Sequence, residues 1–305
     1  MTVSWRDEFK LWIRAIRFYT HTASVLPVVV GSSYAWLVTG RFRWDVFLAA
    51  MVAGALYQSG CNLINDFFDF KYGLDREGTY GGSGVLPRKE MTPRKMAAGI
   101  VVLLALGSLL GLWLAWTCGW IILWLGLGGL FSLVFYTATP HSAKYSALGE
   151  PLVFLSMGVA MTLGGYAIQT GDISWNAVWI SLPLSFLVTA ILQANDMRDL
   201  ADDRLGGIKT ISIGVGPLGA RAFYSALIFG AFISMAALVW SGIAPWPVLL
   251  SFLTLPMAIQ IHRTIWRHRG EKEFALKDAP VEAAKLHLAF NTLMVIGLVL
   301  GKCID

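Results

Sequence analysis

The chain has 305 residues, of which 56% are hydrophobic and 14% are charged, with a mean hydropathy of +0.62. Because soluble globular proteins carry about 25% charged residues, this composition excludes a soluble domain. It predicts a polytopic membrane protein, integral to the cell (inner) membrane. The net charge of +5 would indicate a nucleic-acid partner in a soluble protein. Here it is typical of the Lys and Arg excess of cytoplasmic loops, and we expect no nucleic-acid partner.

A charged, amphipathic segment at residues 5–10 precedes the first apolar run, so we expect no cleavable signal peptide. Nine apolar runs of about 20 residues then predict nine transmembrane helices. The fold class is therefore all-α, with one integral membrane domain over residues 1–305. The predicted helices cover residues 18–40, 45–68, 94–116, 118–137, 147–169, 174–195, 217–240, 246–266 and 280–301. The isolated Cys61, Cys118 and Cys303 have neither disulfide nor metal-ligand spacing, which favours structural roles.

The loops between these helices alternate in charge. One side of the membrane receives the basic N-terminal segment, Lys144 and the basic loops 69–93, 196–216 and 263–279. The other side has little beyond Arg41, Arg43 and Lys302. The positive-inside rule therefore predicts a cytoplasmic N-terminus and an external C-terminus.

An acidic motif occurs twice at the ends of predicted helices. Residues 65–69 read Asn-Asp-Phe-Phe-Asp and end the second helix, and residues 195–199 read Asn-Asp-Met-Arg-Asp and end the sixth. Four spans separate the two copies, so both lie on the cytoplasmic side, as in parallel repeats. Two short matches could coincide by chance, but each also opens a long polar loop. We therefore expect a pseudo-repeat of helices 1–4 and 5–8, followed by helix 9.

The spacing of polar residues around the first motif predicts a functional face. If the second helix continues through the motif, Asn62, Asp66 and Asp69 lie at positions i, i+4 and i+7 and share one side. Asp75 follows in the loop. Ionisable groups at the ends of lipid-spanning helices are costly to place and mark functional sites.

The second motif predicts a matching stripe. Asp196, Asp199 and Asp203 lie at i, i+3 and i+7, whereas Asp202 points elsewhere. Carboxylates from both motifs in one partly dry site would repel one another, so several are protonated or cations neutralise them. Oxygen-rich clusters of this kind suit Mg²⁺, which bridges a few carboxylates to substrate phosphates.

Basic residues beside the motifs favour a phosphate-bearing ligand. Arg198 and Lys209 are embedded among the acidic residues, and Lys71 follows the first motif. Tyr136 and Lys144 sit where the fourth helix meets its cytoplasmic loop. A purely topological role is the alternative for basic residues on this side, and it is favoured for Lys89, Arg94, Arg267 and Arg269.

The loop at 76–93 contains Gly81, Gly82 and Gly84, whose backbone freedom would let amides approach a phosphate. It matches no phosphate-loop pattern, and a lid is an equal alternative. The aromatic residues 67, 68 and 70 interleave with the acids and could stabilise a carbocation, although ordinary packing is favoured for each.

Residues 62–75, and residues 195–203 with their continuation through 207–210 to 213–214, resemble the UbiA-type superfamily of intramembrane aromatic prenyltransferases. The Lys-Tyr-Ser-Ala-Leu-Gly-Glu sequence at 144–150 and the Asn-Asp-x-Arg-Asp form of the second motif look like the branch that prenylates 1,4-dihydroxy-2-naphthoate in menaquinone biosynthesis. The resemblance implies nine helices around a central cavity with a polar cap of cytoplasmic loops. It also implies an enzyme that transfers an alkyl group other than methyl.

The resemblance further assigns roles to individual residues. Asp66, Asp69, Asp199 and Asp203 would hold Mg²⁺ on a polyprenyl diphosphate and so be catalytic, with Asp75 and Asp196 as further metal ligands. Asn62, Asn65, Lys71, Arg198 and Lys209 would bind the Mg²⁺ diphosphate. Tyr136 and Lys144 would act near the acceptor or the leaving group.

Two segments depart from the family pattern. Residues 17–20 read Arg-Phe-Tyr-Thr where relatives often have Arg-Pro, and residues 81–88 lack the Gly-x-Arg sequence of many naphthoate enzymes. The first departure puts the family role of Arg17 in question, and the second puts the acceptor in question.

The resemblance implies electrophilic aromatic substitution. Loss of diphosphate generates an allylic carbocation, which an aromatic acceptor attacks in a water-poor cavity that the bilayer-soluble tail enters. Other acceptors share the donor site: 4-hydroxybenzoate, homogentisate, a tetrapyrrole or a glycerol-phosphate lipid. An ion-coupled transporter is the alternative from another class, but it predicts charged residues near the membrane midplane rather than at helix ends.

Overall fold

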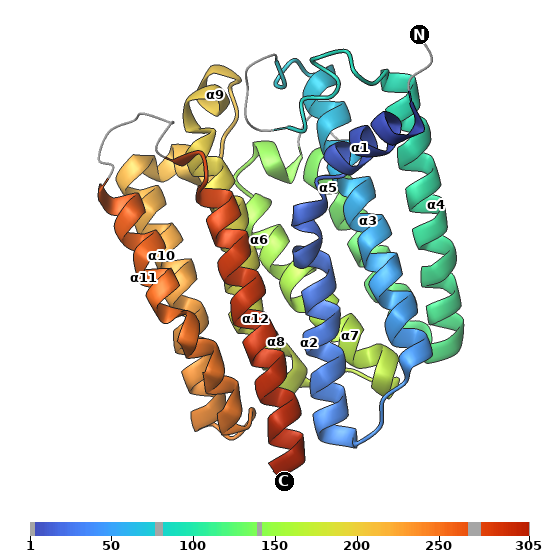
Figure 1. Cartoon of the computed structure of the whole chain (residues 1–305), viewed down its shortest axis with the longest axis vertical. Helices are drawn as coiled ribbons and strands as arrows, with labels where there is room; N and C mark the ends of the chain where they lie inside the picture. Colours follow the sequence, from blue (N-terminus) through green and yellow to red (C-terminus); the bar gives the residue numbers. More distant parts are fainter. Residues whose placement is uncertain (1–3, 77–81, 139–141, 268–275, 305) are drawn as a thin grey trace.

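The computed structural model describes residues 4–76, 82–138, 142–267 and 276–304. In these residues nine helical spans are long and apolar enough to cross a membrane, which makes this an integral membrane protein of all-α fold. They run side by side in Figure 1. In chain order the spans are Phe18–Thr39, Trp44–Lys71, Pro93–Cys118, Trp120–Thr137, Gly149–Thr170, Trp175–Arg198, Ile211–Trp240, Trp246–Arg267 and Ala279–Ile304.

The predicted spans are confirmed to within a few residues, except at the seventh. Six spans are single helices: α3 (Trp44–Lys71), α4 (Pro93–Cys118), α5 (Trp120–Thr137), α8 (Trp175–Arg198), α10 (Ile211–Trp240) and α12 (Ala279–Ile304). The seventh, α10, begins six residues before the predicted start at 217, and its backbone breaks at Gly216, where φ is +72°. Pro217 follows this glycine, so the chain kinks where the apolar run begins.

The other three spans are composite. The first joins the 3₁₀ turn η1 (Phe18–His21) to α2 (Thr22–Thr39), and the eighth joins the 3₁₀ segment η4 (Trp246–Thr254) to α11 (Leu255–Arg267). The fifth comprises α6 (Gly149–Val153), a π-helical segment η3 (Phe154–Ala160) and α7 (Met161–Thr170). Such π segments inside helices frequently mark functional sites.

Two short helices lie outside the spans at the end of the bundle that carries both acidic motifs, here called the motif end (Figure 1). Helix α1 (Trp5–Ala15) is amphipathic and packs Trp12 and Ala15 against α4 and the 85–91 segment. Its Trp5 and Phe9 side chains remain exposed, as expected for a helix lying in a membrane interface. Helix α9 (Leu200–Leu205) follows α8 directly.

Glycines allow close packing between α2 and α7. A Cβ atom at Gly31 would lie 2.0 Å from the Thr162 carbonyl oxygen, and one at Gly165 would lie 2.6 Å from that of Val28. The Ser32 hydroxyl donates a hydrogen bond of 2.8 Å to the Gly165 carbonyl. Because small residues let lipid-spanning backbones approach each other, these glycines fix the spacing of the two helices.

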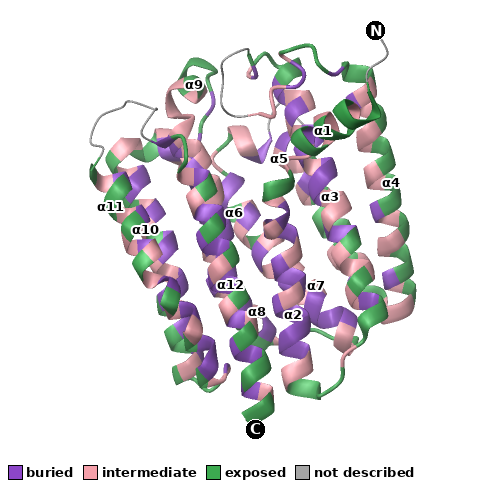
Figure 2. Ribbon diagram, in the orientation of Figure 1, coloured by how far each residue is buried: buried purple, intermediate pink, exposed green. Residues whose placement is uncertain are grey.

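The largest buried core lies around α2, α8, α10 and α12, whereas α4 and α5 bury few of their side chains (Figure 2). Exposed tryptophans gather at the helix ends opposite the motif end: Trp44, Trp116, Trp120, Trp175, Trp240 and Trp246. This distribution is typical of an aromatic belt at one membrane–water interface.

Candidate active site

The first motif lies on the last turns of α3, which continues to Lys71. The helix therefore places Asn62, Asp66 and Asp69 on one face, and all three side chains are buried. A carboxylate buried at a helix end is stable only with hydrogen-bond donors or cations around it. The structure supplies both.

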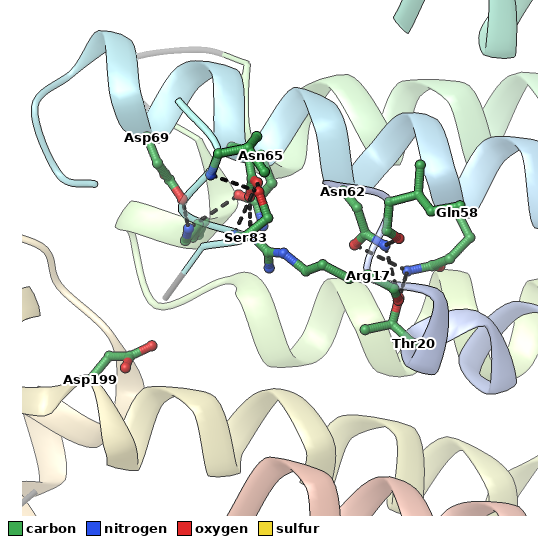
Figure 3. A network of polar contacts seen from close by, with 12 residues as sticks. Arg17, Thr20, Gln58, Asn62, Asn65, Asp69, Ser83 and Asp199 are labelled. Carbon is green, nitrogen blue, oxygen red and sulfur yellow. Dashed lines mark hydrogen bonds and ion pairs between the residues drawn. The ribbon is translucent and has the colours of Figure 1, made fainter. Parts of the chain in front are cut away.

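Asp66 is held by two segments far from it in the sequence. One carboxylate oxygen accepts an ion-paired hydrogen bond from the Arg17 guanidinium, and the other accepts from the Ser83 hydroxyl and, at 3.1 Å, from the Ser83 backbone N–H. Figure 3 shows Arg17 and Ser83 converging on this point. The loop that contains Ser83 thus covers the first motif.

Asp69 is held by the segment that follows α5. The Lys144 ammonium donates to one carboxylate oxygen at 2.6 Å, and the Tyr145 hydroxyl donates to the other at 2.7 Å. Lys144 also donates to the Asn65 side-chain carbonyl at 3.1 Å. Lys144 therefore contacts both Asn65 and Asp69 of the first motif.

Asn62 has a positioning role in this structure. Its amide donates to the Ile16 carbonyl at 2.7 Å and to the Thr20 hydroxyl at 2.8 Å (Figure 3). These bonds hold the turn between α1 and η1, in which Arg17 adopts the left-handed conformation with φ of +49°. Because a non-glycine residue rarely adopts this conformation, the turn has a specific geometry, and it directs Arg17 toward Asp66.

The second motif departs from the predicted single stripe. Helix α8 ends at Arg198, and Asp199, with φ −91° and ψ 6°, joins it to α9. The Asp199 N–H still bonds to the Asn195 carbonyl and its own carbonyl accepts from the Asp203 N–H, both at 2.9 Å. Asp196 and Asp203 therefore belong to two helices, because aspartate favours helix ends over interiors.

Arg198 folds back onto its neighbour. Its guanidinium donates two hydrogen bonds, of 2.7 and 2.6 Å, to the two oxygens of Asp199. In Figure 3 Asp199 lies across from the Asp69 network, with its carboxyl group turned toward it. Both motifs therefore face the same space at the motif end.

Asp196 lies deeper in the bundle, near Glu150 and Tyr136. Glu150, in the first turn of α6, is 2% exposed, and its buried Oε1 has no hydrogen-bond partner among the described groups; it lies within electrostatic range of Asp196. Tyr136 lies within electrostatic range of both.

Two predicted diphosphate ligands lie at the margin of the site. The Lys71 ammonium sits 5.6 Å from the centre of the Phe68 ring, and its side chain is exposed. Lys209 is exposed as well, and its backbone N–H donates to the Tyr145 carbonyl at 3.3 Å. Asp202 is exposed, consistent with its expected outward direction.

Asp75 is buried, with Gly82 beside its carboxyl group. A Cβ atom at Gly82 would lie 2.0 Å from Asp75 Oδ2, so this glycine lets the loop backbone pass close to the carboxyl group. Gly81, with the rest of residues 77–81, and Arg269 lie outside the described residues. Lys89, Arg94 and Arg267 are on the exposed surface, in keeping with the topological role expected for them.

Charge pairing and burial both act on the site's titratable groups. Burial opposes the charges of Arg17 and Lys144, but nearby Asp66 and Asp69 outweigh it and raise the pKa of both groups. Burial, with repulsion from Asp66 and Asp69, raises the pKa of Asp75 to about 6. Burial and repulsion from Asp199 raise the pKa of Asp203 to about 7. Asp75 and Asp203 thus sit where added positive charge is favourable.

A cavity of about 490 Å³ opens beside these residues and extends into the bundle. Its polar end includes Arg17, Asn62, Asn65, Tyr136 and Asn195. The remainder is lined mainly by small and aliphatic residues of α2, α3, α4, α5 and α7 and by the π-helical segment η3. Among the described residues that line it, Phe67, Phe68 and Phe70 are not found, and Phe67 instead packs against the 85–91 segment.

Residues 24–288 match the family model described as the UbiA prenyltransferase family. The chain belongs to this family. It is 31% identical to the 1,4-dihydroxy-2-naphthoate octaprenyltransferase of Bacillus subtilis (strain 168), over 95% of this chain and 92% of that protein. It is 28% identical to the human UbiA prenyltransferase domain-containing protein 1, over 98% of this chain and 86% of that protein.

Solved structures of UbiA homologues share the fold. The apo homologue from Aeropyrum pernix K1 superimposes with a TM-score of 0.69 at 20% identity, covering 92% of this chain and 97% of that one. The Archaeoglobus fulgidus homologue bound to GPP and Mg²⁺ gives a TM-score of 0.64 at 17% identity, covering 93% and 99%. The protein is thus an integral membrane prenyltransferase.

The donor chemistry of this prenyltransferase fits Mg²⁺. Among the described residues no three His, Cys, Asp or Glu side chains lie close enough to hold one ion by themselves. Mg²⁺ at phosphate sites typically takes only one or two carboxylates and completes its shell with water and phosphate. The buried Nε of Arg17 also has no hydrogen-bond partner among the described groups, although Arg17 lines the cavity. An anionic ligand beside Asp66 would satisfy it.

Three residues of the site were not predicted from the sequence. Ser83 and Tyr145 bind the motif acids, but nothing in their local sequence distinguishes them from other loop residues. Glu150 could have been predicted, because an acidic residue in the first turn of a lipid-spanning helix commonly marks a functional site. For Arg17 the sequence showed a departure from the family pattern, and the structure gives it a direct contact with Asp66.

Proposed function

We propose that this prenyltransferase transfers a polyprenyl group from polyprenyl diphosphate to 1,4-dihydroxy-2-naphthoate, in an Mg²⁺-dependent reaction of menaquinone biosynthesis. The observation that carries the proposal is the position of the two acidic motifs. Buried Asp66 and Asp69 lie on α3 beside Arg17 and Asn65, which line the polar end of an elongated apolar cavity, and Asp199 faces them. A charged head group and a long hydrocarbon tail match these two environments. The choice of 1,4-dihydroxy-2-naphthoate as acceptor is based on the similarity to the Bacillus subtilis octaprenyltransferase.

In this proposal the acids of both motifs hold the ion and the basic residues hold the diphosphate. The residues proposed as metal ligands are Asp66, Asp69, Asp75, Asp196, Asp199 and Asp203. The ion, when bound, supplies positive charge that neutralises the diphosphate oxygens. Lys71 and Lys209 are proposed to approach from the margin of the site, with Asn62 and Asn65 on the α3 face.

Arg17, Lys144 and Arg198 are the cations nearest the motif acids, at Asp66, Asp69 and Asp199 respectively. They neutralise carboxylates in this arrangement, and a bound diphosphate would compete for them. Each of these basic side chains can transfer its hydrogen bonds from a carboxylate to a phosphate, because both groups present several oxygen acceptors close together. They then stabilise the negative charge that develops as the allylic C–O bond breaks.

The acceptor reacts where the polar end meets the apolar wall. The electron-rich ring attacks C1 of the prenyl cation, forming a carbon–carbon bond. The ring regains aromaticity by losing a proton, or carbon dioxide where the attacked carbon bears a carboxylate. Tyr136 lines this region and Lys144 lies beside it, so they are proposed to orient the acceptor or the leaving group. The apolar wall excludes water, which would quench the cation.

The membrane arrangement is part of the same proposal. We infer that the motif end faces the cytoplasm of a cell (inner) membrane, because the basic loops gather there. The termini lie at opposite ends of the bundle in Figure 1, as an odd number of spans requires. We also propose that the single domain is a pseudo-repeat of helices 1–4 and 5–8, with one acidic motif in each half.

The test is an assay of the purified full-length chain with labelled farnesyl diphosphate, Mg²⁺ and separate acceptors. We expect product with 1,4-dihydroxy-2-naphthoate, and none after EDTA. If product forms only with 4-hydroxybenzoate, homogentisate, a tetrapyrrole or a glycerol-phosphate lipid, the proposed acceptor is wrong but the proposed prenyl transfer still holds. If no acceptor is prenylated and the protein moves an ion across liposome membranes, the result contradicts the proposed enzyme and favours a transporter.

A further inference from the structure

The cavity has nearly the same length along two independent walls. On α3 its lining residues run from Asn65 to Ala50, and on α5 they run from Tyr136 to Ile122. At about 1.5 Å of rise per residue these stretches span roughly 22 and 21 Å. Each isoprene unit adds four carbon–carbon bonds, or about 5 Å when extended. The cavity therefore accommodates about four isoprene units.

Four glycines interrupt the side-chain lining of the cavity. Gly126 and Gly129 of α5 line it, and a Cβ atom built at either position would meet nothing within 4 Å. Gly111 of α4 and Gly164 of α7 line it as well and have the same open space. Helical glycines without a close neighbour cost stability relative to alanine. Because these four glycines also line the cavity, their open space leaves room for a ligand there.

The α5 glycines lie at defined depths below the polar end. Tyr136, Leu133, Gly129 and Gly126 share the cavity face, in keeping with helical spacing. Gly129 lies seven residues, about 10 Å, below Tyr136, and Gly126 lies ten residues, about 15 Å, below it. These depths correspond to about two and three isoprene units.

We propose that Gly126 and Gly129 leave the space that the prenyl tail of the donor occupies beyond about its second and third units, with about four units lying inside the cavity and any longer tail continuing into lipid. This inference rests on the proposed function, since it assigns the cavity to the donor tail. The glycines leave space at two successive positions along the tail. A side chain added at either one would meet the tail at that depth.

The experiment compares three leucine substitutions in the purified full-length enzyme. Donors are dimethylallyl, geranyl, farnesyl, geranylgeranyl and octaprenyl diphosphates, with Mg²⁺ and 1,4-dihydroxy-2-naphthoate. Gly129→Leu is expected to lower kcat/KM by at least about tenfold for donors of three or more units and to spare the shorter ones. Gly126→Leu is expected to do the same from about four units, so the two cutoffs differ by one unit.

Gly128→Leu is the matched control. Gly128 is exposed on the same helix, has open space within 4 Å, and is not among the cavity-lining residues. This variant is expected to retain the wild-type profile with every donor. Competition for labelled geranyl diphosphate by each unlabelled donor gives a second readout, and its cutoffs should match those of turnover.

Unchanged turnover of long donors in both Gly126→Leu and Gly129→Leu would overturn the inference and leave the proposed function intact, since the tail would then lie elsewhere. An equal loss with all donors, including dimethylallyl diphosphate, would also overturn it. If the wild-type enzyme turns over no donor of any length, the proposed function itself fails. The outcomes for the two proposals are therefore distinct.

Discussion

At the residue scale, each motif carboxylate at the centre of the site has an internal cation or donor. Asp66 pairs with Arg17 and Ser83, and Asp69 pairs with Lys144 and Tyr145. A buried ion pair contributes little net stability, yet removal of one partner leaves an uncompensated charge. The pairs therefore hold the acids in place until a more strongly charged ligand arrives.

The Arg17–Asp66 pair gives a direct test of this coupling. Arg17→Gln should destabilise the metal-free protein by about 3–5 kcal/mol, because Asp66 is left buried without its cation. Asp66→Asn should destabilise the protein for the same reason, because it leaves the charge of Arg17, whose side chain is 14% exposed, without its partner. The double variant should be more stable than the sum of the two losses predicts. Thermal unfolding followed by tryptophan fluorescence measures this, and strict additivity of the two losses would refute the coupling.

The raised carboxyl pKa values predict a pH dependence of stability. Asp203, with its pKa raised to about 7 by burial and by Asp199, binds a proton in the folded state that the unfolded chain, at 3.8, releases. Its contribution to stability is therefore complete below about pH 4 and is lost as the pH rises through 7. Asp75 acts in the same direction with a folded pKa of about 6.

The corresponding variant is Asp203→Asn, studied without divalent ions. Its melting temperature should fall less between pH 5 and pH 8 than that of the wild type. Asp172→Asn, exposed in the loop before α8, should keep the wild-type pH profile. A wild-type profile in Asp203→Asn would show that this carboxyl group is not the source of the pH dependence.

At the element scale, close helix packing and open cavity walls both depend on glycine, for opposite reasons. Gly165 of α7 packs against the α2 backbone, whereas neighbouring Gly164 faces the cavity with open space. Gly165→Ala should force α2 and α7 apart and destabilise the protein by about 1–3 kcal/mol. Gly164→Ala should be neutral or slightly stabilising, since alanine favours helix. Melting temperatures of the two variants in detergent measure the difference, and equal values would contradict the packing account.

The spans were predictable from hydropathy alone, because lipid imposes their length and apolar character. The face of α3 that carries Asp66 was predictable too, since it depends only on helix period. The contacts of Arg17 and Ser83 with Asp66 were not, because they depend on a left-handed turn and on a loop crossing from another segment. The break at Asp199 was missed for a local reason: a continuous helix was assumed through a residue that favours helix ends.

At the scale of the whole molecule, the two ends of the bundle differ in chemistry. The motif end carries the acidic motifs, α1, α9 and basic loop residues (Figure 1). The helix ends at the opposite end of the bundle carry the exposed tryptophans. This asymmetry agrees with a cytoplasmic active site that receives a charged diphosphate from the aqueous side. The apolar cavity below it receives a tail that partitions into lipid.

The C-terminal cysteine offers a test of the proposed orientation. Cys303 is exposed near the end of α12, whereas Cys61 and Cys118 are partly buried. We expect a membrane-impermeant maleimide to label the protein on intact cells, and Cys303→Ser to remove most of that label. Labelling of Cys303 only after permeabilisation would reverse the orientation and place the motif end outside.

The central claim is that the two acidic motifs form one catalytic site, and alanine variants of one acid from each motif test it most directly. Transfer from labelled farnesyl diphosphate to 1,4-dihydroxy-2-naphthoate with saturating Mg²⁺ is measured for Asp66→Ala, Asp199→Ala and, as control, Asp172→Ala at the opposite end of the bundle. The account predicts that Asp66→Ala and Asp199→Ala each lose at least about a thousandfold in rate while remaining folded and inserted, and that Asp172→Ala keeps the wild-type rate. A near-normal rate in either motif variant would contradict it.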